Sequence, residues 1–169
     1  MQKWPYSISY RWIILTVLIL ITISIEIQWL THASVARPAE VFYKGQFVPS
    51  SFLNIDFLAM IYMIMFLIIS FPASYLIDKF GIRKTLTFAA IMLGFFSLLK
   101  AFFANNFIGI VISQTGLAIA QPIILNSVTS LTAKWFPLEE RGLATGLASL
   151  AQYIGIIIAM VVTPLLIVS

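Results

Sequence analysis

The chain has 169 residues, of which 61% are hydrophobic and only 9% are charged, and its mean hydropathy is +1.03. A soluble domain carries about 25% charged residues, so this composition excludes an ordinary soluble fold and indicates a membrane protein. The net charge of +4 comes from small basic groups between apolar runs, which is not the basic stripe of a nucleic-acid-binding protein, so we expect no nucleic-acid partner.

Five apolar runs are each long enough to cross a bilayer as a helix, which takes about 20 residues. The first follows a basic amino terminus, as in a signal peptide, but it is too long and lacks a small-residue cleavage site, so we expect it to be retained. The sequence therefore predicts an all-α, multi-pass membrane protein surrounded by a lipid bilayer. The predicted spans are residues 12–30, 57–77, 85–103, 107–133 and 142–168.

The distribution of lysine and arginine predicts the orientation of these spans. With the amino terminus in the cytoplasm, seven basic residues lie on the inner side and three on the outer side, which agrees with the positive-inside rule. The segment 31–52 and Ser169 would then lie outside, in a plasma membrane or a bacterial inner membrane. The inner residues are Lys3, Arg11, Lys79, Arg83, Lys84, Lys134 and Arg141, and the outer ones are Arg37, Lys44 and Lys100.

Polar residues near the end of the first span are candidates for substrate binding. Glu26 is a carboxylate inside a span, where charged groups usually face a cavity, and Gln28 and Trp29 follow it. The Trp29 ring could stack on a cationic group. The alternatives are that Glu26 reaches outer water and that Trp29 anchors the helix in the interface.

The fourth and fifth spans carry two further patterns. Gln114, Gln121 and Asn126 make the fourth span polar, and the proline after Gln121 interrupts the backbone hydrogen bonds, as in helices that line transporter sites. The alternative is that these side chains bond to neighbouring helices. In the fifth span, small residues at 142 and 146 and at 151 and 155 predict close helix packing. We expect Lys100 to extend to the outer interface and His32 to be solvated.

The sequence contains no pattern that indicates catalysis or a bound cofactor. It has no cysteine and a single histidine, which excludes thiolate or histidine-cluster metal sites. It also lacks a serine–histidine–acid set and a glycine-rich phosphate loop. We therefore expect neither an enzyme nor a metal or organic cofactor.

The turn after the second span is the most specific motif. The residues from Ser74 to Lys84 read SYLIDKFGIRK and resemble the signature loop of the major facilitator superfamily, Gly-x-x-x-Asp-[Arg/Lys]-x-Gly-x-[Arg/Lys]-[Arg/Lys], with serine in place of the first glycine. The resemblance implies a charge network that helps to hold one state of an alternating-access transporter. The residues implied in this gating role are Asp78, Lys79, Gly81, Arg83 and Lys84, with Arg141 as a partner.

A narrower resemblance covers most of the chain. Gln28-Trp29, residues 55–63, 71–74 and 120–136 are similar to the feline leukaemia virus subgroup C receptor-related family, whose members are associated with choline, related amines and haem. The resemblance implies that Trp29 and Gln121 line a pocket for an organic cation. It says nothing about Glu26, which leaves the mode of transport open.

These resemblances imply the amino-terminal part of a longer transporter. The superfamily has about twelve spans in two halves, so five spans would form most of the amino-terminal six-helix half, and the carboxyl-terminal half would be missing here. We therefore expect secondary active or facilitative transport of a small organic solute. The alternative is a non-transporting receptor or assembly subunit that uses the outer segment 31–52.

Overall fold

The apolar runs form long helices, as predicted. This computed structural model describes residues 8–48 and 52–167, which leaves the predicted positions of Lys3, residue 168 and Ser169 outside the described residues. Five of the described helices are long and apolar enough to cross a membrane. They are α1 (Ile8–Leu30), α3 (Phe57–Phe80), α4 (Ile82–Phe102), α5 (Phe107–Trp135) and α6 (Leu138–Leu166).

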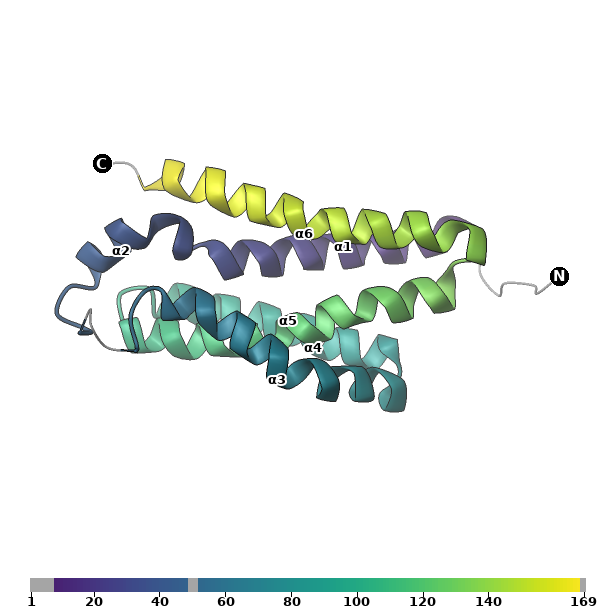
Figure 1. Cartoon of the computed structure of the whole chain (residues 1–169), viewed down its shortest axis with the longest axis horizontal. Coiled ribbons are helices and arrows are strands. Elements are labelled where there is room, and N and C mark those ends of the chain that lie inside the picture. The colour runs from purple at the N-terminus through teal and green to yellow at the C-terminus, as the bar shows by residue number, and fades with distance from the viewer. Residues whose placement is uncertain (1–7, 49–51, 168–169) are drawn as a thin grey trace.

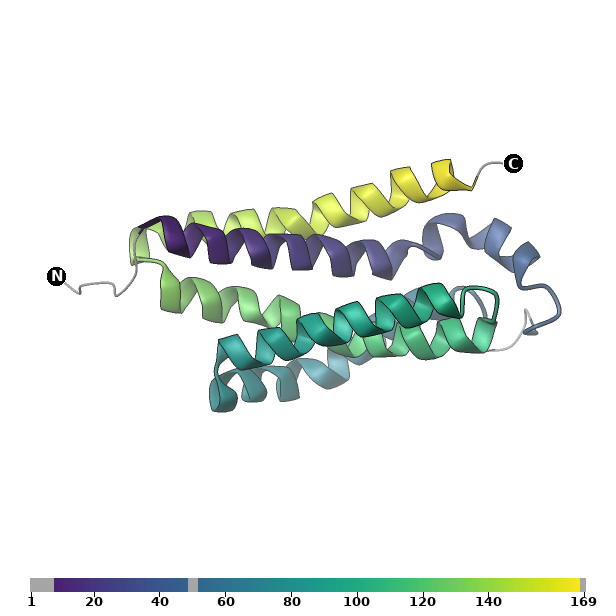
Figure 2. The ribbon, with the colours of Figure 1, turned by 180° about the vertical axis from the view of Figure 1, so that it is seen from behind.

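The helices pack in two layers around α5. α1 lies along α6, and α3 and α4 both lie along α5 (Figure 1). α5 also contacts α1 and α6, and it therefore joins the two layers. The beginning of α1 and the end of α6 lie at opposite ends of the bundle, as Figure 2 also shows from behind. The all-α fold class predicted from the sequence is confirmed.

The outward faces of the helices are apolar. Phe71 on α3 is 86% exposed and Phe102 on α4 is 84% exposed, and α6 exposes a series of large aliphatic side chains. A protein that placed so much apolar surface in water would aggregate. These faces suit contact with lipid or with further helices.

The segment 31–52, which we predict to lie outside, is a packed cap over its described residues. It forms a short 3₁₀ turn (Ala33–Val35) and the helix α2 (Ala36–Phe42). Tyr43 is buried against Phe107, and its hydroxyl donates a hydrogen bond to the Ala104 carbonyl. Gln46 donates to the Asn105 carbonyl at 3.1 Å. The segment is thereby attached to the turn between α4 and α5.

Glycine 81 permits the sharp reversal between α3 and α4. It has φ of +83°, a backbone conformation that favours glycine. Its N–H donates to the Ile77 carbonyl at 3.0 Å and so ends α3. The motif therefore needs this glycine for its backbone, whatever its charged residues do.

Candidate functional site

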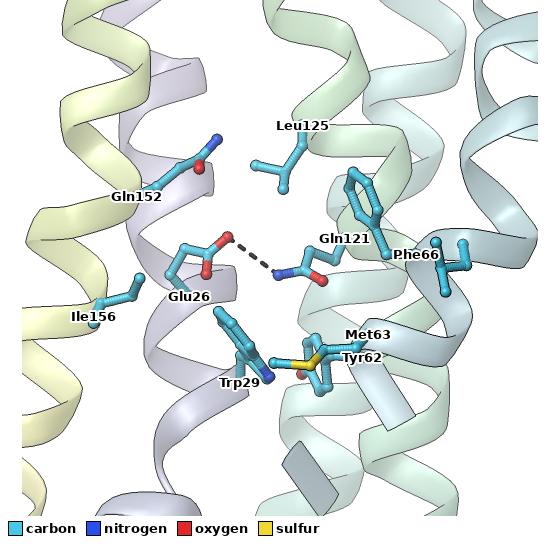
Figure 3. A pocket seen from close by; sticks show the side chains of 10 residues that line it. Glu26, Trp29, Tyr62, Met63, Phe66, Gln121, Leu125, Gln152 and Ile156 are labelled. Carbon is cyan, nitrogen blue, oxygen red and sulfur yellow. Dashed lines mark hydrogen bonds between the residues drawn. The ribbon is translucent and has the colours of Figure 1, made fainter. Parts of the chain in front are cut away.

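A cavity of about 380 Å³ opens between the two layers. Helices α1, α3, α5 and α6 all contribute to its wall, and the labelled side chains point into the same space (Figure 3). Among its lining residues, none is lysine, arginine or histidine. They are Glu26, Trp29, Tyr62, Met63, Phe66, Leu67, Gln121, Leu125, Gln152 and Ile156.

Glu26 and Gln121 meet across this cavity. The Gln121 amide nitrogen donates to one Glu26 carboxylate oxygen at 3.2 Å (Figure 3). Glu26 is only 2% exposed and Gln121 is 5% exposed. The interior position of Glu26 disfavours the alternative that it reaches outer water.

An aromatic pair forms the adjoining wall. The rings of Trp29 and Tyr62 are stacked, with centroids 6.2 Å apart and an angle of 28° between their planes. The indole N–H of Trp29 donates to the Ala59 carbonyl at 3.1 Å, which fixes the ring. The buried Tyr62 hydroxyl has no hydrogen-bond partner among the described residues. Aromatic rings and a carboxylate therefore border one cavity, a combination that suits a cation.

Two long side chains bind the end of α1 that carries Trp29. The Lys100 ammonium donates to the Gln28 carbonyl and to its side-chain oxygen, both at 3.0 Å. The Gln114 amide donates to the carbonyls of Gln28 and Trp29, both at 3.3 Å, and to that of Leu58 at 3.2 Å. The last carbonyls of a helix lack partners within the helix, so these donors stabilise the end of α1.

This arrangement corrects two expectations. Lys100 is buried, with 8% of its surface exposed, and does not extend to the outer interface. Free carbonyls at the end of α1 lie within its reach and bind its ammonium group. His32 is also buried rather than solvated, with 9% of its surface exposed.

Three of the candidate binding residues lie outside the cavity. Gln28 bonds to Lys100, and Gln114 is held by backbone carbonyls. The Asn126 amide donates to the Ser70 carbonyl at 2.9 Å and to the Ser74 hydroxyl at 3.1 Å, which joins α5 to α3. In this structure these three side chains connect helices. For Gln114 and Asn126 this agrees with the alternative that polar residues of the fourth span bond to neighbouring helices.

The cavity also contains residues that the sequence analysis missed. Tyr62 and Phe66 are four residues apart on α3, so they share a face of that helix. Met63 lies beside them, and Gln152 is a polar residue within the small-residue run of α6. Two features of the sequence could have indicated these lining residues. They are the spacing of the aromatic residues on α3 and the single glutamine in the small-residue run of α6.

The motif charges lie at the end of the bundle that we predict to be cytoplasmic. Asp78, Lys79, Arg83 and Lys84 are all exposed there. Arg141 instead donates to the carbonyls of Ala133 at 2.7 Å and Phe136 at 3.0 Å, at the end of α5. In this structure Arg141 therefore binds these carbonyls and does not take part in the charge network expected at the motif. The ion pair that forms between described residues joins Arg11 to Glu140, with 2.8 Å between the Arg11 Nη2 and Glu140 Oε1 atoms.

No group of three histidine, aspartate or glutamate side chains in the described part of the chain could hold a metal ion. The cavity itself offers one carboxylate, amides and aromatic rings. Its chemistry suits the binding of an organic molecule.

Comparison with known families agrees with the two-layer helical bundle and its motif. The sequence profile of the Major Facilitator Superfamily matches residues 7–169. This chain belongs to that superfamily.

Characterised relatives have similar sequences over most of this chain. Solute carrier family 49 member A3 of Danio rerio is 29% identical over 164 residues, which cover 93% of this chain and 34% of the relative. The choline/ethanolamine transporter FLVCR2 of Homo sapiens is 28% identical over 159 residues, which cover 93% of this chain and 29% of the relative. The chain is thus related to the family expected from the sequence, and it spans about one third of the length of these relatives.

Proposed function

We propose that this chain is the amino-terminal part of a secondary transporter that moves choline or a related small organic cation by alternating access. The observation that carries the proposal is the cavity, which combines one buried carboxylate with an aromatic pair and has no basic residue in its wall. Its volume of about 380 Å³ lies within the range of small-molecule sites, about 300–1,000 Å³.

Four of the lining residues have a specific role in this proposal. The ring faces of Trp29 and Tyr62 attract the cationic head of the substrate. Glu26 supplies the opposite charge, and Gln121 orients its carboxylate by the hydrogen bond at 3.2 Å. Gln28, Gln114 and Asn126 act indirectly, because their hydrogen bonds hold the helices that carry these groups.

The relatives support the same substrate class. FLVCR2 of Homo sapiens is described as a choline/ethanolamine transporter. The relatives extend well beyond the length of this chain, so we propose that further helices complete the cavity from the side of α3 and α6 and allow rocking between two halves.

The gating role of the motif belongs to another conformation. Asp78, Lys79, Arg83 and Lys84 have exposed side chains around the turn at Gly81. We propose that they pair with charges across the cytoplasmic entrance when the opposite state forms, with the amino terminus on that side of the membrane.

Site-directed labelling tests the location of the site. The chain contains no cysteine, so Gln152→Cys, made in the complete protein after replacement of cysteines elsewhere, gives one thiol in the cavity wall. We expect a trimethylammonium methanethiosulfonate reagent to label it, and we expect choline to slow the labelling. The control is Glu139→Cys, an exposed position at the start of α6, whose labelling should not respond to choline. Equal labelling rates at Gln152→Cys with and without choline would contradict the proposed site.

A further inference from the structure

We infer that Glu26 binds either a proton or the substrate cation, one at a time, so that the transporter exchanges organic cations for protons. This inference rests on the proposed function and specifies how the same cavity couples substrate movement to an ion gradient. It follows from the position of Glu26 and from the groups around it.

Among the described residues that line the cavity around Glu26, none carries a positive charge. Gln121 donates one hydrogen bond to one carboxylate oxygen, and the second oxygen accepts none from the described residues. The carboxylate is nevertheless 2% exposed and lines the cavity. Figure 3 shows it pointing toward the space between α1 and α5.

The groups that face Glu26 from the neighbouring helices are neutral. α3 contributes the Tyr62 hydroxyl, α5 contributes Gln121, and α6 contributes Gln152. α6 also brings Gly155 close to the stem of Glu26.

Arg11 of α1 and Lys100 of α4 bind elsewhere. The buried ammonium of Lys100 donates to Gln28. Arg11, fifteen residues earlier on α1, pairs with Glu140 at 2.8 Å. Neither side chain lines the cavity, so no basic residue in the described part of the chain acts as a counter-ion to the carboxylate.

A carboxylate at this depth in a membrane is unfavourable unless a positive charge accompanies it. Because no basic residue of the described helices lines the cavity, a mobile cation supplies the compensating charge. A proton converts the carboxylate to a carboxylic acid, and an organic cation forms an ion pair with the carboxylate. The two cannot occupy the same group together, so arrival of one requires departure of the other.

The amide of Gln121 suits both states. Its NH₂ group donates to the carboxylate, as observed at 3.2 Å. Its carbonyl oxygen can accept a hydrogen bond from the carboxylic acid after rotation of the side chain. The proton taken up on one side of the membrane would leave Glu26 as the cation arrives on the other side, and the exchange of two single positive charges is electrically neutral.

The test uses the complete protein in lipid vesicles that contain a pH-sensitive dye. With vesicles acidic inside, we expect inward uptake of labelled choline to be several-fold faster than without a gradient. Entry of added choline should also be accompanied by exit of protons from the vesicles. The dye reports this change of internal pH for the unaltered protein. Glu26→Gln should abolish both responses, while Glu26→Asp should restore part of them.

The control variant is Glu40→Gln, an exposed acid on α2 outside the cavity, which should retain the response to pH. Choline uptake that is the same with and without the pH gradient, and that moves no protons, would overturn exchange and leave the proposed transport intact. If the vesicles show neither choline uptake nor proton movement, both proposals are overturned.

Discussion

Glu26, Gln28 and Trp29 lie within one turn of α1 but contact different parts of the protein. Residues three apart share a face of a helix, whereas residues two apart point in nearly opposite directions. Glu26 and Trp29 accordingly line the cavity together, while Gln28 turns toward Lys100 on α4. Helical spacing alone could have separated Gln28 from the candidate pocket.

Replacing Trp29 tests the aromatic wall. We expect Trp29→Ala to raise the KM for choline about 2- to 30-fold, since a cation over an aromatic ring contributes about 0.5–2 kcal/mol. Initial uptake rates over a range of choline concentrations measure this change. Tyr75→Ala, an exposed aromatic residue on α3, is the control and should leave KM unchanged. An unchanged KM in Trp29→Ala would remove Trp29 from the site.

The helices show which sequence patterns were sufficient and which were not. Apolar run length predicted the five long helices, and the motif predicted the turn at Gly81, because these features depend on local sequence. The contacts of Lys100 and Asn126 depend on where other helices place free carbonyls and hydroxyls. The composition of a span does not say which groups of other helices lie near it, so the hydrogen-bond partners of Lys100 and Asn126 could not be predicted.

The small residues of α6 illustrate the same limit. Close packing was expected at both pairs of small residues, but a Cβ at Gly142 or Gly146 would have no neighbour within 4 Å. A Cβ at Gly155 would lie 2.7 Å from Glu26 Cβ and 2.8 Å from the Ile23 carbonyl oxygen. Only the second pair therefore brings α6 against α1 in the described structure.

Substitution of Gly155 should separate these two helices. We expect Gly155→Ala to lower the free energy of unfolding by about 1–3 kcal/mol, as overpacking does, because backbone atoms of α1 must move. Gly146→Ala is the matched control on the same helix and should be neutral. Thermal unfolding of the purified complete protein compares them. Equal melting temperatures for the two variants would contradict the close approach of α1 and α6.

Removal of the Lys100 ammonium tests the attachment of α1 to α4. We expect Lys100→Met to lower the free energy of unfolding by about 1.5–3 kcal/mol, the usual contribution of charged hydrogen bonds. Amide hydrogen exchange should rise in residues 27–31, where the carbonyl partners lie. Lys84→Met, an exposed position on the same helix, should change neither quantity. Unaltered exchange at the end of α1 in Lys100→Met would show that the ammonium does not stabilise it.

At the scale of the whole molecule, the cavity joins the two layers of the bundle. α1 and α6 contribute the acid and Gln152, and α3 and α5 contribute Tyr62 and Gln121. A relative movement of the layers would therefore change the distance of 3.2 Å between Gln121 and Glu26. This position suits a site whose affinity changes as a transporter changes state.

Uptake of labelled choline by vesicles that contain the complete protein tests whether this cavity is the substrate site. We expect saturable uptake that unlabelled choline inhibits, and that Gln121→Leu reduces at least several-fold while the exposed control Tyr153→Leu does not. Uptake no greater than in vesicles without protein, or equal uptake by Gln121→Leu and the unaltered protein, would contradict the assignment of this cavity as the substrate site.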